Sequence, residues 1–322
     1  MVNEAATGRV QSTRWLRRLG LAAWIGFAIG LVFVRGAPLD TLQVLAWTIA
    51  TLAVVTALGG GRVRRVLSDW LPLVGLLLVY GLTRGAADTL GMPIHVTTLA
   101  GLESALFGGE VPTVWLQDRF YRHPPWTAVW WEIPVALVYV SHFVVPYVLG
   151  AWHWTRGRAR WLFWLRRYVA VTVTALALFI LVPAAPPWMA ARLEVIGPVQ
   201  RTAGRGWSLL GVDVAERLVE TGQASVNLVA AMPSLHAAHA ALVPALFWCG
   251  RAWTVRLALL AYPIAMGFVL VASGEHYVVD VVAGFALVTV SCCACRRWEA
   301  RRPPKAIPAR HLEEVATGAG RR

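Results

Sequence analysis

A serine and two histidines stand close together in the apolar stretch that begins at Pro233. In segment 232–239 (MPSLHAAH) these polar groups interrupt small and aliphatic residues. Polar side chains within a membrane span are unfavourable unless they are hydrogen-bonded or take part in function. Proline suits the first turn of a helix, so we expect Ser234 among the exposed backbone N–H donors of a helix N-terminus. Such a terminus binds anions. Ser234 is therefore expected either to donate to a phosphate or to cap the helix.

The second cluster is segment 273–280 (SGEHYVVD), which follows another apolar run. His276 and Asp280 are four residues apart, so they share one face of a helix. In that arrangement the carboxylate can accept a hydrogen bond from one imidazole nitrogen and raise the basicity of the other. This spacing favours His276 as a nucleophile, while Glu275 and Tyr277 beside it are expected either to contact substrate or to anchor in the membrane interface.

Both clusters are expected to leave the membrane on the same side. His236 and His276 can then face one another across a common cavity, where one imidazole attacks phosphorus and the other protonates the leaving oxygen near neutral pH. His239 lies on a neighbouring face and is expected to have a packing or supporting role rather than a catalytic one. His142, inside another apolar run, is a further functional candidate because polar residues within a membrane span are often functional.

The composition predicts a membrane protein. Of 322 residues, 57% are hydrophobic and 15% are charged, with a net charge of +13, whereas a soluble domain is usually about a quarter charged. Eight apolar runs predict an all-α polytopic bundle of about eight transmembrane helices. They are 19–34, 41–58, 70–83, 127–152, 168–185, 233–250, 257–273 and 276–295.

The positive charge lies in short clusters between these runs, which argues against a nucleic-acid partner and indicates a bilayer. Of the 30 Lys and Arg residues, 22 lie on one side of the eight-span arrangement and 8 on the other. The positive-inside rule therefore predicts a multi-pass protein of the plasma membrane, with both termini cytoplasmic and the histidine clusters at the extracytoplasmic face.

Segments 231–236 (AMPSLH) and 274–280 (GEHYVVD) resemble two signatures of the type 2 phosphatidic acid phosphatase superfamily, in particular its branch containing inositol phosphorylceramide synthase. The resemblance implies that His276 forms a phosphohistidine, Asp280 supports it, and His236 acts as acid and base. It also implies a six-helix core. The expected parts are a cytoplasmic N-terminal tail (1–18), two additional helices (19–66), a six-helix phosphatase- or phosphotransferase-like domain (67–297) and a disordered cytoplasmic tail (298–322).

The sequence departs from the superfamily in its cationic phosphate clamps. The first signature requires a lysine, but Lys305 is the only lysine, and Val269 and Leu270 stand where the third signature often has Ser-Arg. Arginines must replace these groups. The first choice is Arg84, which ends an apolar run and pairs at i+4 spacing with Asp88. The reserves are Arg192, Arg201 and Arg205.

The leading hypothesis is an enzyme that cleaves a membrane phospholipid or polyprenyl phosphate. It is expected to pass a phospho-headgroup, inositol-phosphate-like by the resemblance, to a lipid or polyol acceptor, and hydrolysis by water is the close alternative. The phosphohistidine route needs no cofactor and no metal. Two other classes remain open: a zinc enzyme with His236, His239 and Asp280 as ligands, and a transporter or scaffold whose histidines relay protons.

Overall fold

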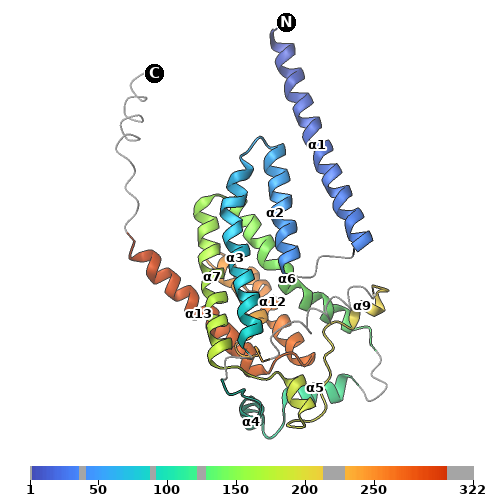
Figure 1. Cartoon of the computed structure of the whole chain (residues 1–322), viewed down its shortest axis with the longest axis vertical. Coiled ribbons are helices and arrows are strands. Elements are labelled where there is room, and N and C mark those ends of the chain that lie inside the picture. The colour runs from blue at the N-terminus through green and yellow to red at the C-terminus, as the bar shows by residue number, and fades with distance from the viewer. Residues whose placement is uncertain (1, 36–40, 88–91, 122–127, 213–228, 303–322) are drawn as a thin grey trace.

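The computed structural model describes residues 2–35, 41–87, 92–121, 128–212 and 229–302, which form helices joined by turns and loops (Figure 1). Within these ranges no β-strand forms, and only isolated bridges join His95 and Ala230 to Ala184. The expected all-α class is confirmed. The helices are α1 (Val2–Arg35), α2 (Thr41–Leu58), α3 (Val63–Ala87), α4 (Thr97–Leu106), α5 (Pro112–Phe120), α6 (Glu132–Thr155), α7 (Arg158–Leu181), α8 (Pro187–Arg192), α9 (Gly206–Leu209), α11 (Leu235–Phe247), α12 (Trp253–Ala272) and α13 (Val278–Ala300).

The predicted apolar runs coincide with helices. Among the described residues, 5 helices are long and apolar enough to cross a membrane, namely α2, α6, α7, α12 and α13. Helix α11 is apolar but shorter, with 13 residues, and α1 and α3 contain the two remaining runs. The polytopic membrane bundle is therefore confirmed.

Helix α11 lies at the centre of the bundle and packs against α7, α12 and α13. Its alanines make this close packing possible, since Ala237, Ala238 and Ala240 are buried. Gly284 on α13 serves the same purpose, because a Cβ there would lie 2.4 Å from the Ser234 carbonyl oxygen. Small residues thus bring the N-terminal ends of α11 and α13 together.

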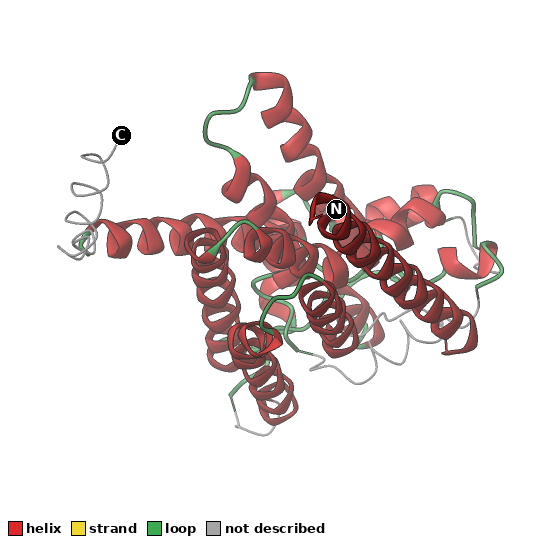
Figure 2. Cartoon of the chain, turned by 90° about the horizontal axis from the view of Figure 1, so that it is seen from above, coloured by secondary structure: helices red, strands yellow, loops and turns green. Residues whose placement is uncertain are grey.

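The three N-terminal helices pack on the outside of this core, with α2 against α3 and α6 and with α3 against α7. Asp69 on α3 accepts a hydrogen bond from the Trp154 indole at 2.9 Å and pairs with Arg158. Beside it, Trp70 packs against Trp161 with ring centroids 4.7 Å apart. Helix α1 packs on α2 and projects from the bundle (Figure 1), and α13 extends beyond it on one side (Figure 2).

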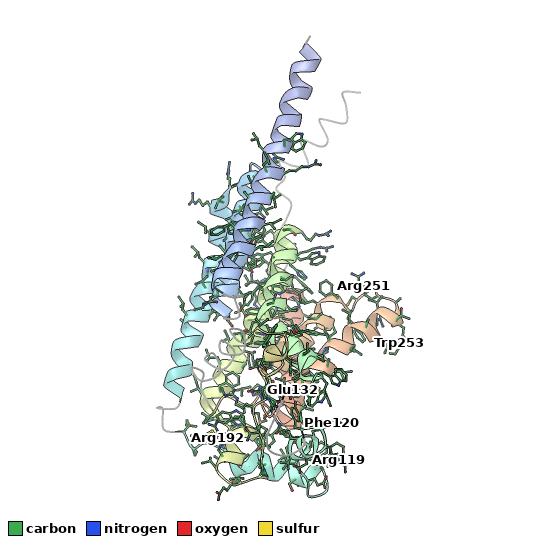
Figure 3. All side chains as sticks on the ribbon, turned by 90° about the vertical axis from the view of Figure 1, so that its right-hand side faces the viewer. Arg119, Phe120, Glu132, Arg192, Arg251 and Trp253 are labelled. Atoms are coloured by element: carbon green, nitrogen blue, oxygen red, sulfur yellow. The ribbon has the colours of Figure 1, made fainter. Side chains whose placement is uncertain are left out.

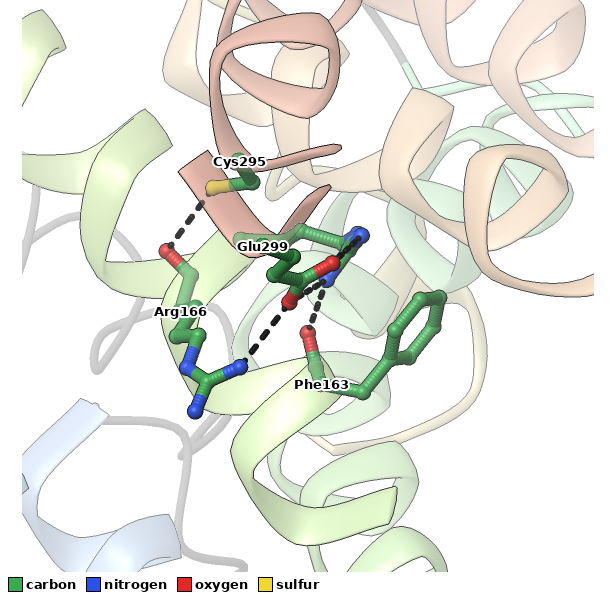
Figure 4. Close-up of polar contacts among 5 residues, drawn as sticks. Phe163, Arg166, Cys295 and Glu299 are labelled. Carbon is green, nitrogen blue, oxygen red and sulfur yellow. Dashed lines mark hydrogen bonds and ion pairs between the residues drawn. The ribbon is translucent and has the colours of Figure 1, made fainter. Parts of the chain in front are cut away.

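Helix α7 begins at Arg158, earlier than the expected start at residue 168. Gly157, with φ +109°, lets the chain reverse directly after α6. Arg166 and Arg167 therefore lie on α7, where both bind Glu299 on α13 at 3.1 and 2.9 Å (Figure 4). Because this ion pair satisfies even the buried guanidinium of Arg167, the helix can include arginines that the hydropathy pattern places in a loop.

Short helices cover one end of the bundle. Figure 1 shows α4 and α5 at this end, opposite the start of α1, and Figure 3 shows Arg119, Phe120 and Arg192 there. We call it the site end, because the chain enters both α11 and α13 from this end.

Candidate active site

His276 and Asp280 lie where the chain turns from α12 into α13. Gly274 makes the turn with φ +77°, and a Cβ there would lie 2.8 Å from the Gln200 carbonyl oxygen. The His276 Nδ1 lies 3.6 Å from Asp280 Oδ2, slightly beyond hydrogen-bond length. Asp280 is fully buried, and Oδ2 accepts the backbone N–H of Tyr277 at 2.9 Å. The carboxylate is thus held by the backbone, and His276 presents Nδ1 to it and Nε2 away from it.

His236 lies in the first turn of α11 and faces His276. The two ring centroids are 5.9 Å apart and the planes are inclined by 57°. A backbone hydrogen bond from the Ser234 N–H to the Asp280 carbonyl oxygen, 2.9 Å long, ties the two segments together. The structure therefore places both imidazoles and the carboxylate at one site, as the spacing of the two clusters predicts.

Ser234 acts as the N-terminal cap of α11. Its hydroxyl oxygen accepts the Ala237 N–H at 3.3 Å, and the residue is fully buried. Of the two roles expected for this serine, the structure shows the cap.

Arg201 forms a two-pronged ion pair with Glu275, the residue before His276. Its Nε and one terminal nitrogen lie 3.1 and 2.8 Å from the two carboxylate oxygens. Burial lowers the pKa of Arg201, but the charge and hydrogen bonds of Glu275 outweigh it, so the net shift of the pKa is upward. The guanidinium also lies over the Trp188 ring, 4.6 Å from its centroid, and Arg192 lies at 4.9 Å from the same centroid. A permanent cation thus stands next to the histidine pair.

The other arginines are placed differently. Arg84 belongs to the last turn of α3, but its side chain and Asp88 lie outside the described residues, so their pairing stays a prediction. Arg205 binds the buried Glu132 at 3.2 Å, and a Cβ at Gly206 would lie 2.2 Å from the Glu132 carbonyl oxygen. Arg205 therefore fixes α9 against the start of α6.

Tyr277 is neither an interface anchor nor exposed to a substrate. It is 0% exposed and packs with Leu99, Ala100 and Ala184. Burial, with smaller effects of the charges on Asp280 and Glu103, raises the pKa of its phenol well above the usual range. This burial favours neither of the roles expected for Tyr277, because the loop that carries it folds under α4 instead of facing the lipid.

A stack of rings continues from His236 into the bundle. His142 on α6 lies against His236 with ring centroids 3.9 Å apart, and His239 lies 5.2 Å from His142. His239 Nε2 contacts the Thr172 hydroxyl at 3.2 Å, which fits the supporting role expected for it. Tyr139, absent from the sequence-based prediction, also stacks with His236, with ring centroids 5.0 Å apart. A tyrosine in an apolar run gives no signal in the sequence that distinguishes it from packing residues.

The proposed zinc ligands do not converge. Within the described ranges, no three side chains of His, Cys, Asp and Glu meet as a metal site would require. His236 and His239 instead stack with His142, and Asp280 faces His276. The geometry therefore gives the zinc hypothesis no support.

A cavity of about 860 Å³ opens between α4, α5 and residues 195–197. Its lining includes Ser104, Glu110, Trp115 and Asp118 but none of the predicted catalytic residues. It is therefore a neighbour of the histidine pair rather than part of it.

Comparison with known proteins identifies the family. The family described as the PAP2 superfamily matches residues 97–294, more than half of the chain. Over 258 residues the chain is 25% identical to phosphoinositol dihydroceramide synthase of Bacteroides thetaiotaomicron, covering 77% of this chain and 81% of that protein. No solved structure matches. With its paired histidine segments inside the matched region, the chain belongs to the PAP2 superfamily and is a membrane lipid phosphotransferase or phosphatase.

Proposed function

We propose that this enzyme transfers a phospho-headgroup through a phosphohistidine on His276, with His236 as acid and base and Asp280 as the supporting carboxylate. The observation that carries the proposal is the meeting of His236 and His276, ring centroids 5.9 Å apart, with Asp280 Oδ2 3.6 Å from His276 Nδ1. Two imidazoles at this separation can act on opposite sides of one phosphorus atom.

In the first half-reaction, His276 Nε2 attacks phosphorus and the bond from phosphorus to the lipid oxygen breaks. Protonated His236 gives its proton to that oxygen, so a lipid alcohol leaves and the headgroup phosphate stays on His276. Asp280 compensates the positive charge on the imidazole through Nδ1. The separation of 3.6 Å in the free protein can shorten when the charge develops.

In the second half-reaction, His236 takes a proton from the acceptor hydroxyl as that oxygen attacks phosphorus. The bond between phosphorus and Nε2 breaks, His276 is regenerated, and the product phosphodiester leaves. Arg201 is the cation best placed to hold the phosphate oxygens in both steps, since Glu275 keeps it beside His276. Arg192, which also lies over the Trp188 ring, is the second cation of this site.

The donor is a membrane phospholipid or polyprenyl phosphate, and the acceptor is a lipid or polyol hydroxyl. The similarity to a phosphoinositol dihydroceramide synthase supports an inositol-phosphate-like headgroup and a lipid acceptor. Water in place of the acceptor gives hydrolysis with the same residues.

We further propose that the site faces the extracytoplasmic side of the plasma membrane, with both termini in the cytoplasm. The clustering of Lys and Arg supports this orientation. Arg156 and Arg158 lie at the turn from α6 to α7, at the end of these helices opposite the histidine pair, as the positive-inside rule requires.

The test uses the purified protein in lipid nanodiscs and a phospholipid radiolabelled in its headgroup phosphate. We expect label on the wild-type protein and in a product lipid, and neither with His276→Ala. His236→Ala should lower turnover about a hundredfold or more. His95→Ala is the matched control, because His95 lies on a loop and contacts Thr98 rather than the site. Label retained on His276→Ala contradicts the proposal.

The same assay separates the alternatives. Vanadate, which resembles pentacoordinate phosphorus, should inhibit, and a chelator should not. Product formed only when a lipid alcohol is added indicates a transferase, whereas release of the water-soluble phosphate ester without an acceptor indicates a hydrolase. No turnover with any phospholipid or polyprenyl phosphate contradicts the proposed function.

A further inference from the structure

The first turn of α13 is capped only in part by its own residues. Tyr277 occupies the N-cap position, and tyrosine is not a residue type that caps helices. The first backbone N–H groups of a helix have no partner within the helix, so each needs an acceptor from elsewhere. Asp280 supplies one for Tyr277 at 2.9 Å.

Glu103, from the separate helix α4, supplies another. Its Oε1 accepts the Val279 N–H at 2.8 Å, and the side chain is 0% exposed. A buried glutamate is costly unless it has a specific partner, and here that partner is the backbone next to the histidine and carboxylate of the site. Glu103 thus supplies the acceptor that the side chain of the N-cap residue, Tyr277, does not provide.

Several buried polar atoms around this turn have no hydrogen-bond partner within the part of the chain that the structure describes. They are Glu103 Oε2, Tyr277 Oη, Asp280 Oδ1 and His276 Nδ1. Two of these atoms are carboxylate oxygens, so the turn holds acceptors that have no donor. Without Glu103, the Val279 N–H would be a buried orphan donor, and Asp280, the next residue, carries an oxygen that could be drawn to it and away from His276.

We propose that Glu103 is a positioning residue, which caps α13 from another helix and so leaves the Asp280 carboxylate to His276. The inference rests on the proposed function, because it concerns how the nucleophile is oriented. It adds a residue that touches neither the phosphate nor the imidazoles and acts only through the first turn of α13.

The cap does not depend on ionisation of Glu103. The pKa of this carboxyl is raised to about 7, because burial and the charge of Asp280 outweigh the lowering effect of the backbone N–H groups of Val279 and Val278. A proton on Oε2 leaves Oε1 free to accept the Val279 N–H. A glutamine should therefore replace the glutamate.

The test compares two substitutions of similar size. Glu103→Gln keeps an acceptor oxygen and should keep kcat within about threefold of wild type. Glu103→Met removes the acceptor and should lower kcat about ten- to a hundredfold per folded protein, with little change in KM. Thr113→Val is the control, because Thr113 is equally buried, on α5, and its hydroxyl has no partner within the described structure.

A second measurement does not depend on activity. Hydrogen exchange of the backbone amides of residues 277–280 should be faster in Glu103→Met than in wild type and unchanged in Glu103→Gln and Thr113→Val. Unchanged exchange in Glu103→Met overturns the inference even if the wild type proves inactive on every lipid tested. Wild-type kcat in Glu103→Met also overturns it and leaves the proposed function intact.

Discussion

At the scale of single residues, the site combines two imidazoles with a cation held in place by an anion. The pairing of Arg201 with Glu275 uses both prongs of the guanidinium, and the Trp188 ring supports it from one face. A planar, permanently charged fork of this kind matches the oxygens of a phosphate, which a lysine does not. Under the proposed function, this arginine takes the place of a lysine clamp in a chain whose single lysine is Lys305.

Removing this cation should affect catalysis more than binding of the lipid tail. We expect Arg201→Gln to lower kcat/KM about a hundredfold, the effect of losing one charged donor to the transition state. Arg201→Lys should restore little of it, because an ammonium cannot bind in two places.

The assay is best made in a Glu275→Gln background, so that no unpaired carboxylate is left buried. Arg192→Gln is a comparison variant at the other arginine over the Trp188 ring and should have the smaller effect. Equal kcat/KM for Arg201→Gln and its Glu275→Gln parent would show that another cation holds the phosphate.

At the scale of helices, the site depends on how closely α11 and α13 approach. Each helix carries one of the two histidine segments near its N-terminal end, and only at their junction do the rings meet. Gly284 permits this junction, since an added Cβ would lie 2.4 Å from the Ser234 carbonyl oxygen. Helix packing and the distance between the two imidazoles are therefore coupled.

This coupling predicts opposite effects of one substitution at two glycines. Gly284→Ala should destabilise the protein by about 1–3 kcal/mol, because it forces backbone apart, and should lower turnover of the protein that remains folded. Gly75→Ala, on α3 with nothing within 4 Å of an added Cβ, should be neutral or stabilising. The measurements are the midpoint of thermal unfolding in detergent and kcat. A Gly284→Ala protein with wild-type values of both contradicts the coupling.

At the scale of the whole molecule, burial of the Glu103 carboxyl makes the free energy of unfolding depend on pH. The pKa of Glu103 rises from 4.5 to about 7 in the folded protein, mainly through burial. An acid whose pKa is higher in the folded than in the unfolded state binds its proton more tightly when folded. The free energy of unfolding therefore falls as pH rises from 4.5 to about 7.

The loss should amount to about 3 kcal/mol at most above pH 7. Glu103→Gln cannot ionise, so it should gain stability relative to wild type as the pH increases. We expect the difference between the two unfolding midpoints to be larger at about pH 8 than at about pH 5. A difference that does not change with pH would show that Glu103 does not titrate in this range.

Local patterns in the sequence predicted the class of fold and the residues that could carry out chemistry. Long apolar runs indicate membrane helices, and a histidine four residues before an aspartate is spaced to approach it. His276 and Asp280 do approach one another, although His276 precedes the first residue of α13, whereas His236 reaches them only because α11 packs against α13. The family match agrees with the class of enzyme that these motifs predict.

Tertiary structure decided everything that depends on contacts between distant segments. Arg201 meets Glu275, and Glu103 meets Val279, across long stretches of sequence with no periodic pattern to link them. Burial of Tyr277 is likewise set by α4 folding over it. Hydropathy reports which segments avoid water, but which polar groups satisfy one another is fixed only when the helices pack.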